Sequence, residues 1–266
     1  MSRDSPGDEP ETVAERDAGC FTDPTVLMAG HRGPHPEDDE LFAPSEWPRL
    51  RRAVHDLSWL RTRGYGDNAA LKLVGDRYRL RRRQRNAVAR SACSDEQRSH
   101  RRAARCSLAS LKGQVLEIDG FNVLIALEGA IGGAYLFRGR DGAYRDVDAV
   151  QGTYRIVRET RPALRAVRRA VCEAELDTVV WRLDAHVSNV GRLRERIRAE
   201  APETVVWTED VRESVDEVLA DTEHPVATSD SAILDRSTAW CALEPEALRH
   251  YSGEAKVCRL GDESES

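Results

Sequence analysis

Apolar side chains recur every three or four residues through the stretch 45–93, which is the period of a helix face that packs against a core. The first such run is Trp47, Leu50, Val54 and Leu57. The pattern predicts three helices separated by short turns, and the third of them is strongly basic. Two short helices, a tight turn and a basic second member resemble a helix-turn-helix arrangement.

The ends of the first two helices are expected at residues that commonly start or stop helices. Ser45 is expected to cap the first helix, and Gly64 is expected to end it. Asp67 is expected to cap the second helix. A short turn at 78–80 then leads into the third helix, which opens with four arginines in five residues.

From residue 113 onward, short apolar runs alternate with helical segments. Strands are expected at 114–118, 178–183, 204–207, 225–228 and 239–243. Helices are expected at 121–127, 162–176, 191–199 and 211–219. Strands separated by helices are typical of a parallel sheet with helices on both faces. The predicted fold class is therefore α/β, with a parallel sheet flanked by helices and a small all-α basic domain before it.

The distribution of charge along the chain is more informative than the total charge. The 266 residues carry a net charge of -6, but residues 1–40 carry -8, residues 41–112 carry +12 and residues 113–266 carry -10. A strongly basic block in an acidic chain indicates a nucleic-acid partner. The predicted organisation is an acidic disordered tail over 1–40, a helical basic domain over 41–108, an α/β domain over 109–250 and a loose tail over 251–266. The four acids at 37–40 are expected to be solvated.

Several classes of protein do not fit the composition. The longest uncharged stretches, 120–127 and 129–137, are shorter than the roughly 18 apolar residues that a membrane helix needs. The acidic, polar start of the chain lacks the apolar segment of a secretory signal. None of the six cysteines forms a C-x-x-C pair, so reduced thiols are expected rather than a zinc site or disulfides. These features predict a cytoplasmic protein.

Three predicted strands run directly into an aspartate, namely Asp119, Asp184 and Asp230. Because parallel strands end at the sheet edge where ligands bind, these carboxylates are expected to converge. Converging carboxylates repel one another unless a cation neutralises them or their pKa values rise. Mg²⁺ and Mn²⁺ prefer such oxygen ligands, and a carboxylate-held pair of these ions can activate water at a phosphodiester. The alternative is that each aspartate caps a helix or starts a turn.

The basic block supplies the candidate nucleic-acid-binding residues Arg81, Arg82, Arg83 and Arg85. Their guanidinium groups are expected to contact phosphates. The alternative is a solvated helix face that contacts nothing. Weaker candidates for phosphate contact are Arg145, Tyr154 and Arg155, and His186 is either a base near Asp184 or an exposed loop residue.

The segment at 118–123 (IDGFNV) resembles the opening motif of NYN and PIN-like ribonucleases, an apolar strand followed by Asp-Gly-x-Asn. The segment at 228–231 (TSDS) is similar to their later Thr/Ser-Asp motif. The span from Leu41 to about Leu248 resembles a prokaryotic family that joins domain of unknown function 434 to a PIN-like C-terminal half. The segments that carry this wider match are LSWL at 57–60, ALKLVGDRY at 70–78, RSACS at 90–94, SN at 188–189 and the run 228–235.

The resemblance implies a Rossmann-like, PIN-like fold, a Mg²⁺ or Mn²⁺ site and hydrolysis of phosphodiesters, most often in RNA. Asp119 matches the first metal-binding acid of the family, and Asn122 matches the side chain that orients this acid. Asp230 matches the late acid, supported by Ser229, whereas Asp184 fits a middle acid only by its strand position.

Two further acids complete the predicted metal site. Asp216 is the best-placed candidate for the acid that PIN-like sites carry on a helix. Asp235 is either a ligand near the pocket rim or a solvated helix charge. The predicted function is a Mg²⁺- or Mn²⁺-dependent ribonuclease, and the alternative is a non-catalytic nucleic-acid-binding or adaptor protein with the same fold. A phosphatase or nucleotide hydrolase is a third possibility, against which the long basic block argues.

Overall fold

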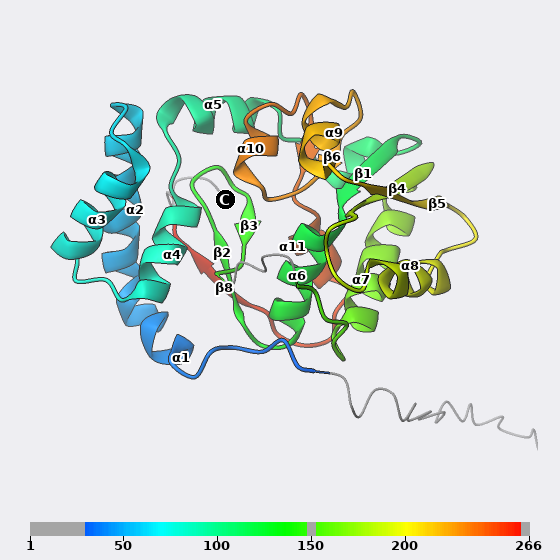
Figure 1. Ribbon diagram of the computed structural model, residues 1–266, viewed down its shortest axis with the longest axis horizontal. Coiled ribbons are helices and arrows are strands. Elements are labelled where there is room, and N and C mark those ends of the chain that lie inside the picture. The colour runs from blue at the N-terminus through cyan, green and yellow to red at the C-terminus, as the bar shows by residue number, and fades with distance from the viewer. Residues whose placement is uncertain (1–29, 148–152, 262–266) are drawn as a thin grey trace, which may run out of the picture.

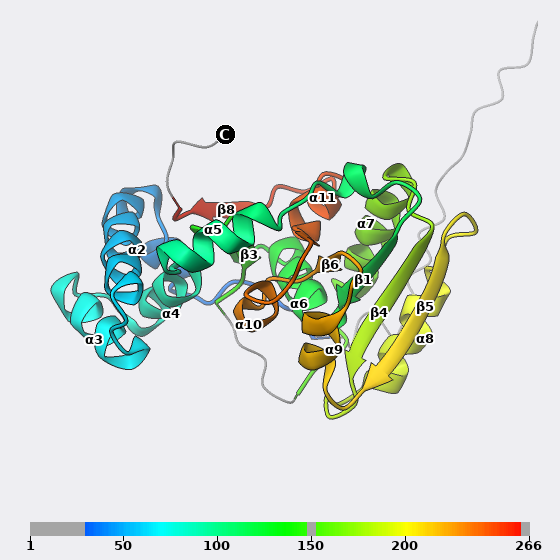
Figure 2. The same cartoon turned by 90° about the horizontal axis from the view of Figure 1, so that it is seen from above.

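The computed structural model describes residues 30–147 and 153–261 (Figure 1). The chain begins with a helical part that ends in a link to the main sheet. Its elements are α1 (Asp38–Leu41), η1 (Pro44–Glu46), α2 (Trp47–Thr62), α3 (Asp67–Arg77), α4 (Arg82–Ser91), α5 (Asp95–Ala103) and η2 (Leu108–Leu111). Figure 2 shows α2, α3 and α4 at one end of the molecule and the main sheet at the other. No helix within the described ranges has both the length and the apolar character needed to cross a membrane.

The main sheet has five strands, all parallel, in the order β5-β4-β1-β6-β7. These strands are β1 (Val115–Asp119), β4 (Thr178–Asp184), β5 (Val206–Arg212), β6 (Val226–Ala227) and β7 (Trp240–Cys241). The helices that follow or connect them are α6 (Gly120–Ile131), α7 (Thr160–Glu173), α8 (Val190–Ala199), α9 (Val215–Asp221), α10 (Ser231–Leu234) and α11 (Leu243–Leu248). The strand order reverses between β1 and β6, and open parallel sheets bind ligands at this switch point.

Helices cover both faces of the main sheet, as predicted. One core cluster joins α6, α7, α8 and α11 to the strands around the buried Trp181. A smaller cluster joins α9 and α10 to the strands around the buried Trp240. The α/β class, the parallel sheet and the preceding helical part are therefore confirmed.

A second, three-stranded sheet packs on the helical part. It consists of β2 (Tyr135–Arg138), β3 (Tyr144–Arg145) and β8 (Lys256–Arg259), in the order β3-β2-β8. Phe137 and Cys258 from this sheet share one core with Leu57 and Val88 from the helices. Phe42 meets the Phe137 ring edge-on, with 4.7 Å between ring centroids. The helical part is thus held to the rest of the chain by a common core.

The prediction of a loose tail over 251–266 is wrong for residues 256–259, because they form β8 and pair in parallel with β2. Four residues are too few to show a clear period, and their pairing partner lies far away along the chain. The last five residues, 262–266, are outside the described residues.

The prediction of an acidic disordered tail over 1–40 is wrong for residues 38–40, which lie in α1. The expected solvation of the run 37–40 is wrong for Asp38, whereas Glu37, Asp39 and Glu40 are exposed as expected. Asp38 is 1% exposed, and both its oxygens accept hydrogen bonds from Arg83, at 2.7 and 3.0 Å. Asp39 accepts from Lys256 at 2.6 Å, and Glu37 accepts from Arg81. These acids are ordered because basic partners from distant segments neutralise them, which local composition cannot reveal. Residues 1–29 lie outside the described residues.

The three predicted helices of the stretch 45–93 are confirmed as α2, α3 and α4. Gly64 follows the end of α2 with φ of +75°, a conformation that glycine adopts without steric cost. The predicted caps are wrong, because Glu46 and Gly66 occupy the N-cap positions of α2 and α3 and neither makes a side-chain cap. The strand predicted at 204–207 extends to Arg212, so the following helix begins only at Val215.

Candidate metal-binding site and adjoining cleft

The predicted acids gather at the switch point of the main sheet. Asp119 is the last residue of β1, and Ile118 before it pairs with Ala227 of β6. Thr228 follows directly after β6, and its hydroxyl donates a 2.8 Å hydrogen bond to Oδ2 of Asp119. This buried bond joins the two strands between which the strand order reverses.

Four carboxylates from different elements interact electrostatically at this point. Burial, followed by the charges of Asp216 and Asp230, raises the pKa of Asp119 to about 7, although the Thr228 hydrogen bond opposes the rise. Burial and the charges of Asp230 and Asp184 also raise the pKa of Asp216. These interactions link Asp119 to Asp216 and Asp230, and Asp216 in turn to Asp230 and Asp184.

Two of these acids, Asp230 and Asp184, also accept hydrogen bonds from backbone N–H groups. Oδ1 of Asp230 accepts hydrogen bonds from the backbone N–H groups of Ala232 (2.7 Å) and Ile233 (3.2 Å), and so caps α10. Oδ1 of Asp184 accepts from the backbone N–H of His186 at 2.7 Å. The capping and turn roles considered as the alternative are thus present, each on one carboxylate oxygen.

Asn122 and Asp235 have contacts that differ from those expected. The side-chain oxygen of Asn122 accepts two 2.9 Å hydrogen bonds, from the backbone N–H and the hydroxyl of Ser229, so Asn122 fixes the loop before Asp230. The side-chain hydrogen bond to Asp119 comes from Thr228, whereas Asn122 contacts Asp119 through its backbone. Asp235 accepts from Arg101 at 2.7 Å and from Gln97 at 2.8 Å, and it faces α5 rather than the four acids.

The oxygen atoms of the four acids are the type of ligand that hard divalent cations prefer. Within residues 30–147 and 153–261, no three His, Cys, Asp or Glu side chains are placed closely enough to hold a metal ion by themselves. Mg²⁺ is usually bound by one or two carboxylates, with water and substrate oxygens as the remaining ligands, so such a cage is not required. Among the described residues, no Lys, Arg or His side chain makes a hydrogen bond or ion pair with these four acids, although Arg145 attracts Asp230 electrostatically. The repulsion between the acids is the observation that favours a cation here.

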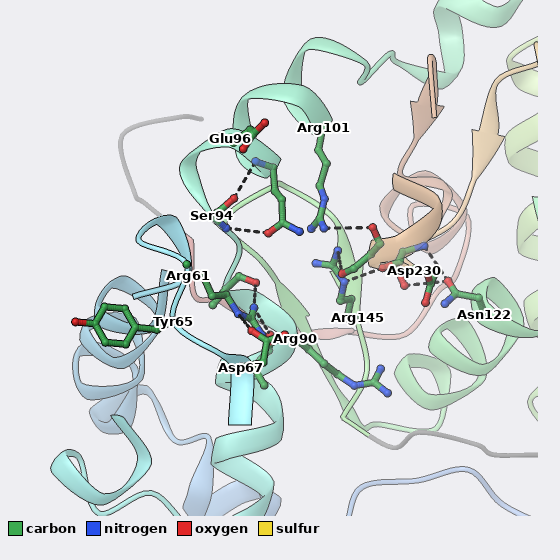
Figure 3. A pocket seen from close by; sticks show the side chains of 16 residues that line it. Arg61, Tyr65, Asp67, Arg90, Ser94, Glu96, Arg101, Asn122, Arg145 and Asp230 are labelled. Carbon is green, nitrogen blue, oxygen red and sulfur yellow. Dashed lines mark hydrogen bonds and ion pairs between the residues drawn. The ribbon is translucent and has the colours of Figure 1, made fainter. Parts of the chain in front are cut away.

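The site opens into a cleft between the sheet edge and the helical part. Its volume is about 770 Å³. On the sheet side it is lined by Asn122, Arg145, Ser229, Asp230 and Ser231, and on the helical side by residues that include Arg61, Tyr65, Arg90, Glu96 and Arg101. Figure 3 shows Asp230 and Asn122 on one side of this cleft and Arg61 and Tyr65 on the other.

A buried ion network fixes the loop that carries Asp230. Asp141 accepts from Arg101 at 2.7 Å and from Arg145 at 2.7 and 2.9 Å, and these three side chains are at most 5% exposed. Arg145 also donates to the Ser229 carbonyl at 2.7 Å, and Arg101 donates to the Ser231 carbonyl at 3.2 Å. Burial would raise the pKa of Asp141, but Arg145 and Arg101 hold it well below its usual range. Arg145 therefore acts within the protein, and its guanidinium is not free to contact phosphates as expected.

Comparison with known proteins places the chain in a family. Residues 108–246 match the family described as "Domain of unknown function (DUF5616)", and residues 49–103 match "Protein of unknown function (DUF434)". The chain belongs to the DUF5616 family. It is also 32% identical over 189 residues to the uncharacterized protein MJ0935 of Methanocaldococcus jannaschii, an alignment that covers 70% of this chain and 88% of that protein. No solved structure matches the chain.

The two family matches divide the site between them. The DUF5616 match contains all four clustered acids together with Asp141 and Arg145, whereas the DUF434 match contains Arg101 and the helical wall of the cleft. The expected division into a helical and an α/β part is therefore supported. The cleft lies where the two matched segments meet.

The four predicted nucleic-acid-binding arginines of the DUF434 segment have different surroundings. Arg81 pairs with Glu37 at 2.7 Å, Arg83 with the buried Asp38, and Arg85 with Asp76 at 2.7 Å. Arg82 is exposed, and no ion pair is recorded for it with any described residue. Three of the four, all except Arg85, line a second groove of about 670 Å³ together with Asn86 and Arg90.

Glu244 of the DUF5616 segment is a buried acid that the sequence analysis missed. It is 1% exposed, and its Oε1 has no hydrogen-bond partner among the described atoms. Burial, with smaller contributions from the charges of Asp119 and Asp146, raises the pKa of Glu244 to about 7, although Arg145 opposes the rise. Glu244 is thus a further acid of raised pKa that interacts with Asp119, and only its burial in α11 distinguishes it from the surface acids beside it.

Proposed function

We propose that this DUF5616 protein is a divalent-metal-dependent nuclease with a PIN-like α/β domain, and that its substrate is RNA. The observation that carries the proposal is the group of four electrostatically coupled aspartates at the switch point of the parallel sheet. One of these acids, Asp230, lines a cleft whose opposite wall belongs to the basic helical part. A carboxylate site beside a basic surface fits a polyanionic substrate better than a small molecule.

The protein groups have separate tasks in this proposal. Asp119, Asp184, Asp216 and Asp230 would hold Mg²⁺ or Mn²⁺, and the bound ion would polarise a phosphate and activate a water. Thr228 holds one oxygen of Asp119, and Asn122 holds the Ser229 backbone next to Asp230. Because the pKa of Asp119 is raised to about 7, metal binding at neutral pH must displace a proton from this carboxyl for part of the molecules.

Asp119→Asn should abolish most RNA cleavage. The amide keeps the shape of the side chain but removes the charge that attracts the cation. We expect a loss of at least about 100-fold in the rate with Mn²⁺ or Mg²⁺, since residues that merely support a ligand already account for 10- to 100-fold. The rate is measured with a labelled single-stranded RNA, and EDTA should stop cleavage by the wild-type protein.

The matched control is Asp177→Asn. Asp177 is an exposed aspartate that precedes β4, at the opposite end of the strand from Asp184. This control should cleave at the wild-type rate. Equal cleavage by Asp119→Asn and wild type would refute the metal site. If the wild-type protein binds RNA but does not cleave it with Mg²⁺ or with Mn²⁺, the non-catalytic adaptor is favoured instead. That alternative is compatible with the spacing of the carboxylates, because no three of the described ligating side chains are close enough to hold a metal ion.

Arg82→Ser should weaken RNA binding and lower its salt dependence. Arg82 is the member of the basic set with no recorded ion pair, so its full charge is available to a phosphate. Loss of one phosphate contact should reduce the slope of log K against log salt by about 1. Arg192→Ser, which removes an exposed arginine of α8 on the α/β domain, is the control. An unchanged slope for Arg82→Ser would remove the second groove from the RNA interface.

A further inference from the structure

The rim of the cleft carries an exposed aromatic ring. Tyr65 lies in the connection between α2 and α3, flanked by Gly64 and Gly66, and it is 56% exposed. Tyr65 is one of the residues that line the cleft on the wall opposite Asp230, and Figure 3 shows its ring directed outward at the rim. A tyrosine of this exposure contributes little to a core, since most of its ring remains in water.

The surroundings of Tyr65 differ from those of Trp59, an aromatic of similar exposure. Trp59 is 47% exposed, does not line the cleft, and has the guanidinium of Arg63 stacked 3.6 Å from its ring centroid. For Tyr65, no ring or cation contact with another described residue is recorded. One face of Trp59 is thus occupied by the protein itself, whereas the Tyr65 ring remains available for stacking.

Cationic side chains accompany Tyr65 along the cleft. Arg61 donates to the Ala89 carbonyl at 3.0 Å and to Asp67 at 2.8 Å, which holds it in place on this wall. Arg90 lines both the cleft and the second groove on α4. Proteins bind single-stranded nucleic acid by combining a positive groove for the backbone with aromatic rings for the bases. A duplex cannot use such a ring, because its bases are already stacked and paired.

We propose that Tyr65 forms a base-stacking subsite for an unpaired nucleotide of single-stranded RNA, whose backbone continues along the cleft toward Asp230. This inference rests on the proposed function for its choice of ligand. It assigns the DUF434 segment a direct part in substrate recognition. The subsite selects for unpaired RNA and tolerates any base, since every base presents a π face.

Binding is measured by fluorescence anisotropy with a labelled single-stranded RNA in EDTA, so that the result does not depend on cleavage. Tyr65→Ala should weaken binding about 10-fold or more, and Tyr65→Phe should bind like wild type because it keeps the ring. Trp59→Ala is the control and should bind normally. A duplex of the same sequence should bind more weakly and should not respond to Tyr65→Ala.

Several outcomes would overturn the subsite. These are undiminished binding by Tyr65→Ala, equal losses in Tyr65→Phe and Tyr65→Ala, equal sensitivity of the duplex, or failure of the wild type to bind single-stranded RNA. Circular-dichroism melting of each variant checks that the exposed substitutions leave the fold intact. If RNA stacks on Tyr65 but Asp119→Asn does not change cleavage, the subsite stands and the nuclease proposal falls.

Discussion

Asp119→Asn should melt at a higher temperature than the wild-type protein at pH 8 in EDTA. The folded-state pKa of Asp119 is about 7, against 3.8 for the free side chain, chiefly because the carboxyl is buried. The folded protein therefore holds this proton more tightly than the unfolded chain does. The stability that this bound proton contributes is fully present below about pH 4 and is lost as the pH rises through about 7. The shift corresponds to at most ~4 kcal/mol at pH 8, and a neutral amide avoids this penalty.

The pH dependence separates this effect from a general change in packing. At pH 4 the wild-type carboxyl is protonated, so the advantage of Asp119→Asn should disappear. Asp177→Asn, which changes an exposed carboxyl, should melt like wild type at both pH values. Mg²⁺ or Mn²⁺ should raise the melting temperature of the wild type more than that of Asp119→Asn. Equal melting of Asp119→Asn and wild type at pH 8 would show that this buried carboxylate carries no penalty.

Two other buried acids, Glu128 and Glu117, differ from Asp119 because each has several hydrogen-bond donors. Glu128 is fully buried, and it accepts hydrogen bonds from Arg32, Tyr154 and Thr160. Glu117 is also buried, and it accepts from Arg182 and Thr222. At these two positions the fold supplies donors to the buried carboxylate.

At the switch point the fold instead places acids beside one another. Asp119 receives a single side-chain hydrogen bond, from the neutral Thr228, while its charged neighbours Asp216 and Asp230 are themselves acids. Local conflict of this kind is expected where a protein gives up stability for activity. The arrangement is consistent with the proposed cation, which would remove the repulsion.

Local sequence patterns were sufficient to locate most of the acid site. The apolar runs before Asp119, Asp184 and Asp230 mark buried parallel strands, and parallel strands end at a common edge. Convergence of the acids follows from that geometry alone. The sequence alone distinguishes Asp216 less clearly as a member of the acid site, because its helix carries other acids. Only the position of α9 beside β1 and β4 distinguishes Asp216 from them.

Contacts between distant segments could not be predicted in this way. Asp38 lies in an acidic run that looks solvated until Arg83, 45 residues away, is placed beside it. Asp235 follows Asp230 closely in sequence, but its side chain binds Arg101 of α5 instead of lying with the four acids. Such pairings depend on how α4 and α5 pack against the rest of the protein. The periodicity within one segment contains no information about this packing.

Asp141→Asn should strongly destabilise the fold. Asp141 is the shared anion of two buried guanidiniums, and its substitution leaves Arg101 and Arg145 without their common partner. Removal of one member of a buried ion pair typically costs ~3–5 kcal/mol, because a buried charge is left uncompensated. We expect a corresponding loss in the free energy of unfolding, measured by urea denaturation followed by circular dichroism.

The matched control is Asp235→Asn, which removes the other acid bound to Arg101. Asp235 is 33% exposed, so water can partly replace it, and the loss should be well below that of Asp141→Asn. Because Arg145 and Arg101 also hold the carbonyls of Ser229 and Ser231, Asp141→Asn should weaken cleavage even under conditions in which the protein remains folded. Equal stability losses for the two variants would contradict the central role of Asp141. Undiminished cleavage by folded Asp141→Asn would show that the network does not position Asp230.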